Sequence, residues 1–126
     1  MRKQKKKALF NNHMQSDWDK EMQAIRHAVL SGENILTTHI LEQMEIRKIS
    51  VQEVAAALLN GKVVEGYDIG NYPGYRNPDL KRTVAFENSN GILVVGVNLY
   101  YNGSTPMIRS LATVFREDKM KNRFLA

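Results

Sequence analysis

The order of apolar and polar positions divides the chain into a helical first half and an extended second half. Ser16 begins the first helical pattern, acidic residues are frequent in its first turn, and Gly32 ends it. Apolar residues recur within it at spacings of four, three and four, which is the period of one buried helix face. These residues are Trp18, Met22, Ile25 and Val29.

Two short helices are predicted next, over residues 37–45 and 51–60. Either of the two threonines that open the first of them can accept a hydrogen bond from an unpaired backbone N–H. Ser50 and Glu53 have the spacing of a capping box at the start of the second. Gly61 follows the last helical residue, where a glycine commonly ends a helix with a positive φ angle.

After this glycine the pattern predicts four strands, connected by turns in sequence order. Residues 68–79 contain two glycines and two prolines and form a loop, and Asn90-Gly91 predicts a hairpin with a type I′ turn. Helices followed by strands indicate an α+β fold, with about three helices packed on one face of a four-stranded antiparallel meander. The strands are predicted at Lys62–Tyr67, Leu80–Glu87, Ile92–Tyr101 and Met107–Phe115.

The 126 residues fit one domain over residues 16–117, preceded by a flexible basic arm at 1–15 and followed by a tail at 118–126. The net charge is +5, but residues 8–115 carry −2, so the basic residues are concentrated at the two ends. A basic arm can hold phosphate backbones, although a solvated terminus has the same composition. Without cysteines, a signal-peptide pattern or a long apolar run, we expect a cytoplasmic protein with no membrane segment.

The motifs of most enzyme classes are missing from the sequence. It contains no phosphate-binding P-loop, dinucleotide fingerprint, H-E-x-x-H motif or nucleophile elbow. The histidines at positions 13, 27 and 39 do not have metal-ligand spacing, so neither a metal nor a cofactor is predicted. Cleavage of an RNA phosphodiester without a metal remains possible, because it needs only a base, an acid and cations that stabilise the phosphorane-like transition state.

His39 is the candidate general base, because the positive end of a helix dipole near its position favours the neutral ring. Arg47 and Arg76 are the candidates for holding the scissile phosphate. Further substrate contacts are predicted from Tyr67, Lys81 and Arg116.

Each candidate also has a structural interpretation, which the sequence leaves open. His39 can bond a nearby turn, and Arg76 can be an ordinary surface arginine. Arg47 can pair with a neighbouring glutamate or with carbonyl groups at the helix junction. Tyr67 and Phe115 can simply pack against the sheet.

The pattern T-x-H-x-x-x-x-M-x-x-R-x-I-S-x-x-E-V, followed by N-G-K-V-V-E-G-Y and a proline-glycine turn with an arginine, resembles the bacterial domain-of-unknown-function family 4258. The resemblance runs from about Trp18 to Glu117 and includes the closing strand LATVFRED. The residues that carry it are Thr37, His39, Met44, Arg47, Ile49, Ser50, Glu53, Val54, Gly61, Val64, Glu65, Tyr67, Arg76, Leu80, Thr113, Val114, Phe115 and Arg116.

What the resemblance implies is a relationship to small α+β ribonuclease toxins of the barnase, colicin and RelE kind. It implies RNA cleavage, a cognate inhibitor protein, and a toxin–antitoxin or phage setting. Two positions depart from the family pattern: Gln43 stands where an arginine is frequent, and Phe115 where a tyrosine is frequent.

A ribonuclease-like toxin-type domain is therefore the leading hypothesis. One alternative is a non-catalytic module, an inactive relative that binds a protein partner. Another is a nucleic-acid-binding accessory protein that uses the basic arm.

Overall fold

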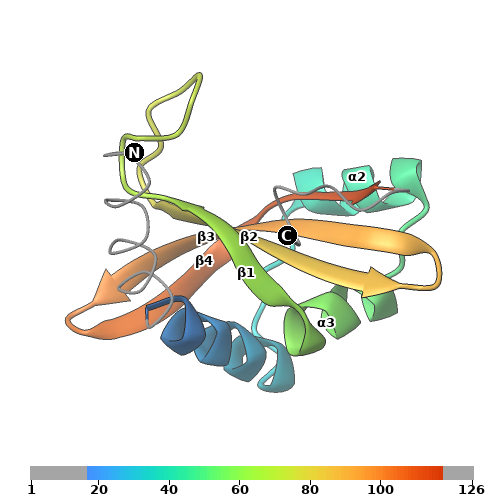
Figure 1. Cartoon of the computed structure of the whole chain (residues 1–126), viewed down its shortest axis with the longest axis horizontal. Helices are drawn as coiled ribbons and strands as arrows, with labels where there is room; N and C mark the ends of the chain where they lie inside the picture. The colour runs from blue at the N-terminus through green and yellow to red at the C-terminus, as the bar shows by residue number, and fades with distance from the viewer. Residues whose placement is uncertain (1–16, 118–126) are drawn as a thin grey trace, which may run out of the picture.

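The computed structural model describes residues 17–117 and confirms the predicted α+β order of three helices followed by four strands (Figure 1). The predicted arm and tail, at 1–15 and 118–126, lie outside the described residues. The N-terminal helix is described over residues 17–30. The other elements are α2 (Thr38–Arg47), α3 (Val51–Asn60), β1 (Lys62–Tyr67), β2 (Leu80–Asn88), β3 (Gly91–Asn102) and β4 (Thr105–Glu117).

The four strands form one antiparallel sheet in the order β1-β2-β3-β4, so β1 and β4 are its edges. The apolar run of β3 occupies an inner position, as its composition predicts. Because side chains alternate between the two faces of a strand, the registers assign each residue to a face. Val84, Val95 and Val114 share one face, while Thr83, Gly96 and Thr113 share the other.

The main core lies between the first of these faces and the helices. Ile25 of the N-terminal helix, Leu58 of α3 and Val95 of β3 are fully buried in one cluster. Figure 1 shows the N-terminal helix and α3 on the same side of the sheet. Within the described residues, the other sheet face carries no helix, and we call it the open face.

The helix α2 adds its apolar side to the same buried cluster as the other two helices, but it does so at the edge of the sheet. This helix packs against β4, the edge strand, and in Figure 1 it lies apart from α3 and the N-terminal helix. Its apolar side, with Ile40 and Met44, still reaches the main core. An edge strand exposes unpaired backbone groups, and a helix beside it is one way to cover them.

A buried ion pair joins the N-terminal helix to the sheet. Glu21 is 1% exposed and lies against Arg82 of β2, which is 7% exposed. Arg82 Nη2 donates to Glu21 Oε2 at 3.2 Å, and the Tyr101 hydroxyl donates to the same oxygen at 2.7 Å. Glu21 and Arg82, two charged residues from the N-terminal helix and β2, therefore belong to the core.

The helix caps are confirmed in part. Thr37 caps α2 by accepting from the Ile40 N–H, and Ser50 and Glu53 form the predicted capping box of α3. The expectation for Gly61 is wrong, since its φ is −79°. A Cβ there would lie 2.5 Å from the Ala57 carbonyl oxygen, so close backbone packing is what requires glycine.

The end of α2 and the β2–β3 turn have particular backbone angles, and the β2–β3 turn differs from the prediction. Lys48 adopts the left-handed conformation, with a φ of 57°, and ends α2 without a glycine. In the hairpin between β2 and β3, Gly91 has a φ of 114°, and Asn90 is not among the described residues with positive φ. The hairpin is confirmed but the type I′ turn, which needs two such residues, is wrong. Arg116 and Glu117, which follow the predicted end of the last strand, belong to β4.

Candidate functional site

Three polar side chains form a row along the exposed side of α2. His39, Gln43 and Arg47 are four residues apart, so they lie one above the other on the helix. His39 Nε2 is 2.7 Å from Gln43 Nε2, and Arg47 Nη1 donates to Gln43 Oε1 at 3.1 Å. We call these three residues the α2 row.

The α2 row is attached to the backbone of β4. Gln43 Oε1 accepts from the Val114 N–H at 3.2 Å and from the Thr113 hydroxyl at 3.3 Å. Arg47 Nη1 donates to the Val114 carbonyl oxygen at 2.6 Å. Two side chains of the row thus pair both backbone groups of one edge residue, as a sheet edge requires. The carbonyl that Arg47 contacts lies on β4, whereas the structural alternative for Arg47 named carbonyl groups at the helix junction.

The orientation of Gln43 decides the role of His39 Nε2 in the contact between the two side chains. Gln43 Oε1 accepts three hydrogen bonds, so the amide nitrogen must be the atom that faces His39. An amide nitrogen can only donate, so His39 Nε2 is the acceptor in this contact. The Nε2 lone pair that a general base needs is therefore used by Gln43.

Arg47 keeps donors for a ligand. Both of its described bonds use Nη1, and a guanidinium carries five N–H groups. The groups on Nε and Nη2 lie outside these bonds, on an exposed side chain. A planar pair of donors suits a phosphate oxygen pair.

The structure does not bring Arg76 to the α2 row. Arg76 is exposed on the 68–79 loop, and Figure 1 shows this loop and α2 at opposite ends of the molecule. The loop is organised by Asn77, which is 1% exposed and donates to the Asp68 and Asp79 carbonyl oxygens at 3.1 and 2.7 Å.

Arg116 is separate from both. Its Nη2 lies 2.8 Å from Glu53 Oε2, at the start of α3. The register pairs Arg116 with Leu93, a residue of the helix-covered face. The Ser50 N–H and the Arg116 guanidinium lower the pKa of Glu53. This pair joins β4 to α3 and is directed away from the open face.

A second group of polar residues lies on the open face, around a hollow of about 200 Å³. Glu65 is held there by two hydroxyl groups: Thr83 Oγ1 donates to its Oε1 at 3.2 Å, and the Tyr67 hydroxyl donates to its Oε2 at 3.2 Å. We call this the open-face hollow. It is lined by Glu65, Tyr67, Tyr72, Pro73, Thr83, Val94, Gly96, Thr113 and Phe115.

Lys81 extends this group along the sheet. Its Nζ donates to Asn98 Oδ1 at 3.0 Å and lies 5.2 and 5.4 Å from the ring centroids of Tyr72 and Tyr75. The two rings are exposed and meet edge to face, with centroids 6.0 Å apart. A cation beside exposed aromatic rings is a common arrangement where proteins hold single-stranded nucleic acid.

Sequence reasoning named Tyr67 and Lys81 but missed Glu65 and Thr83 as site residues. Alternation along β1 places Glu65 and Tyr67 on the same face, which was the available signal. The position of Thr83 opposite Glu65 could not be predicted from the sequence, because the β1–β2 register contains a bulge between Val63 and Glu65.

The two groups meet at Thr113. Its side chain lines the open-face hollow, and its hydroxyl donates to Gln43 of the α2 row. Thr113 lies on the edge strand β4, between α2 and the open face. Thr113 therefore links the α2 row to the open-face hollow.

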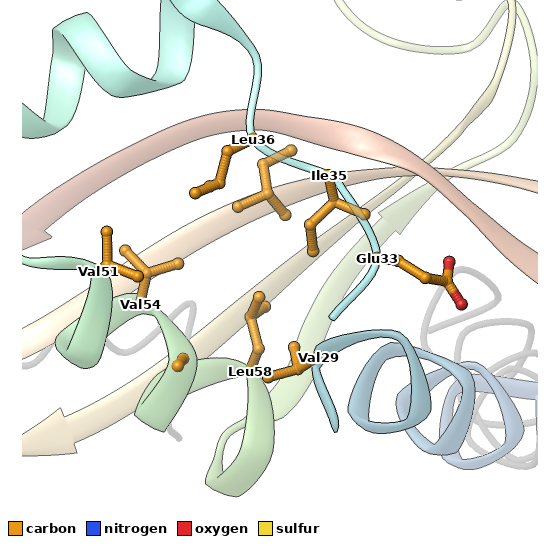
Figure 2. Close-up of a pocket in the computed structure, with 9 residues that line it drawn as sticks. Val29, Glu33, Ile35, Leu36, Val51, Val54 and Leu58 are labelled. Atoms are coloured by element: carbon orange, nitrogen blue, oxygen red, sulfur yellow. The ribbon is translucent and has the colours of Figure 1, made fainter. Parts of the chain in front are cut away.

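A second hollow of about 200 Å³ has a different character (Figure 2). Val29, Leu36, Val51 and Leu58 are among its lining residues, and eight of the nine are apolar. Figure 2 shows the carboxylate of Glu33, the ninth, directed away from them. Such a lining offers no general base or phosphate contact.

The described residues show neither a metal site nor a membrane-spanning helix. Among residues 17–117, no group of three or more His, Asp or Glu side chains could hold a metal ion. None of the helices described there has the length and apolar character needed to cross a membrane.

Comparison with known proteins gives one result. A family model described as "Domain of unknown function (DUF4258)" matches residues 36–116, which include both the α2 row and the open-face hollow. No curated protein and no solved structure matches the chain.

Proposed function

The chain belongs to the DUF4258 family, and we propose that it is a small ribonuclease that cleaves single-stranded RNA without a metal. The observation that carries this proposal is Thr113, which joins a histidine–arginine row to a hollow with aromatic walls. The row supplies groups for proton transfer and charge stabilisation, and the hollow with Lys81 supplies contacts for an RNA strand.

His39 takes the proton of a ribose 2′-hydroxyl in the proposed reaction. The 2′-oxygen attacks the neighbouring phosphorus, the bond to the 5′-oxygen breaks, and that oxygen takes a proton from water. The products end in a 2′,3′-cyclic phosphate and a 5′-hydroxyl. The Gln43 amide must release His39 Nε2 first, so substrate binding has to move that side chain.

Arg47 stabilises the charge that develops on the phosphate through its Nε and Nη2 donors. Tyr67 and Lys81 contact the strand on the open face, and Arg76 contacts it further along, away from the scissile bond. Arg116 is left out, because Glu53 already pairs with it. A cognate inhibitor would act by covering the same surface.

The test is cleavage of an unstructured RNA by wild type, His39→Ala and His27→Ala. His27 is a matched control, since it is an exposed helical histidine with a partner four residues on, Ser31 Oγ at 3.4 Å. Loss of a general base lowers the rate by about 10²–10⁴-fold. His39→Ala should show this loss, His27→Ala should not, and EDTA should leave the wild-type rate unchanged.

Equal rates in the two variants would refute the role of His39, and no cleavage by the wild type would refute the ribonuclease.

One observation favours a second candidate, a module that binds RNA without cleaving it. The α2 row is tied to β4 at Gln43 and Arg47, so its contacts also serve the fold. Binding of RNA without cyclic-phosphate products would select this candidate.

A further inference from the structure

The open-face hollow has the features of a binding site for one nucleobase. Its volume of about 200 Å³ is below the range of about 300–1,000 Å³ that holds a whole drug-sized ligand. A single ring system is the part of a ligand that such a hollow accommodates. Tyr72, Pro73 and Phe115 supply its ring and apolar surfaces, which suit the flat face of a base.

Glu65 determines which edge of a base fits. A carboxylate has about four lone-pair positions, two on each oxygen. Thr83 uses one position on Oε1 and Tyr67 uses one on Oε2. Each oxygen therefore keeps one position, and the pair demands two hydrogen-bond donors side by side.

Guanine is the base that meets this demand. Its N1–H and N2–H₂ groups are adjacent donors on the Watson–Crick edge. Adenine and cytosine each place an acceptor nitrogen beside the amino donor, and uracil has one N–H between two carbonyl acceptors. An acceptor facing Glu65 would repel the carboxylate.

Gly96 is one of the residues that line the hollow. A Cβ at this position would lie 2.9 Å from Thr113 Cγ2, so only glycine fits here without displacing the wall. Lys81 provides the charge at the side: its Nζ is 5.2 Å from the Tyr72 ring centroid. The 5′-phosphate on the ribose of a bound nucleotide is the group that we expect this ammonium group to contact.

We propose that the open-face hollow binds guanine, with Glu65 reading its N1–H and N2–H₂ groups and Lys81 contacting the attached phosphate. This inference rests on the proposed function in that RNA is the source of the base. It adds the base preference, which the α2 row cannot supply.

The experiment measures binding of guanosine, adenosine, cytidine and uridine 5′-monophosphates to the full wild-type chain by calorimetry. A good bidentate contact discriminates by about tenfold or more, so guanosine monophosphate should bind at least that much more tightly than the others. Glu65→Gln should abolish the preference, because an amide offers only one acceptor. Glu87→Gln is the matched control, since Glu87 is an exposed β2 residue that does not line the hollow.

Circular dichroism of each variant verifies that it is folded. Thr83→Val removes one of the hydroxyl groups that orient Glu65, so it should weaken the preference for guanosine monophosphate without abolishing phosphate binding. Equal affinity for the four nucleotides, or no binding, would overturn the inference. Guanine preference without RNA cleavage would support the subsite while the ribonuclease fails. RNA cleavage without a preference for guanine in binding would support the ribonuclease and overturn the guanine subsite.

Discussion

Replacing Glu21 by alanine should destabilise the protein more than any surface charge change. The carboxylate is 1% exposed and is the described partner of both the Arg82 guanidinium and the Tyr101 hydroxyl. Removing one member of a buried pair leaves the other charge without compensation and costs about 3–5 kcal/mol. Native domains have only about 5–15 kcal/mol of stability, so the loss is a large fraction of the total.

The expected shift in melting temperature follows from the same figure. A domain of about 100 residues has an unfolding entropy of about 0.2 kcal/mol/K, so a loss of about 4 kcal/mol lowers Tm by roughly 15–20 °C. Tyr101→Phe removes one hydrogen bond to a carboxylate and should cost about 1.5–3 kcal/mol. The control is Asp79→Asn, whose partner Arg109 is 54% exposed, with an expected cost of about 0–1 kcal/mol.

Urea unfolding monitored by fluorescence gives these free energies. Trp18 is the single tryptophan of the chain and packs against the main core, next to the elements that the ion pair joins. A Glu21→Ala variant that unfolds at the same urea concentration as Asp79→Asn would refute the reasoning. It would mean that Arg82 finds water or another partner when Glu21 is lost.

Three further predictions concern the fold around the site. Glu53→Gln should lower the stability most at a pH above the usual glutamate pKa, and progressively less in more acidic solution. The reason is that a carboxyl group with a lowered pKa stabilises the folded state, and this stabilisation is lost as the pH falls through the folded pKa. Urea midpoints of wild type and variant over a pH series check this, and a difference that is constant with pH would contradict it. Gln43→Ala should speed hydrogen exchange at the Val114 amide, while His39→Ala should leave that amide protected. Gly61→Ala should cost about 1–3 kcal/mol in urea unfolding, and an unchanged midpoint would contradict the close packing at this glycine.

The order of helices and strands could be predicted because it depends on local patterns. The bounds of α3 and β1 agree with the sequence prediction, since a capping box opens α3 and the change of period at Gly61 separates the two. The Asn-Gly signal located the hairpin but not its turn type. Local signals therefore fix where elements begin and end better than they fix the backbone angles between them.

The placement of α2 could not be predicted in the same way. A helical period identifies the apolar side of a helix, but not the element that this side contacts. Gln43 looked like the loss of an arginine, whereas its amide pairs the Val114 N–H and orients His39. The partner lies 71 residues away in sequence, on an edge strand whose position depends on the whole sheet.

Long-range pairing also explains the other differences. Glu21 lies near the start of the N-terminal helix and is buried because Arg82 and Tyr101 meet it from β2 and β3. Glu65 becomes a candidate binding group because Thr83 pairs with it across the β1–β2 register. Neither partner has a recognisable spacing along the chain.

The central claim is that the α2 row and the open-face hollow form one surface for single-stranded RNA. Amide chemical shifts, recorded while a DNA–RNA oligonucleotide without a 2′-hydroxyl at the cleavage position is added, test it most directly. The account predicts that the shifts gather at Gln43, Thr83 and Val114 and are small along α3. Shifts confined to α3 and the N-terminal helix, or none at all, would contradict it.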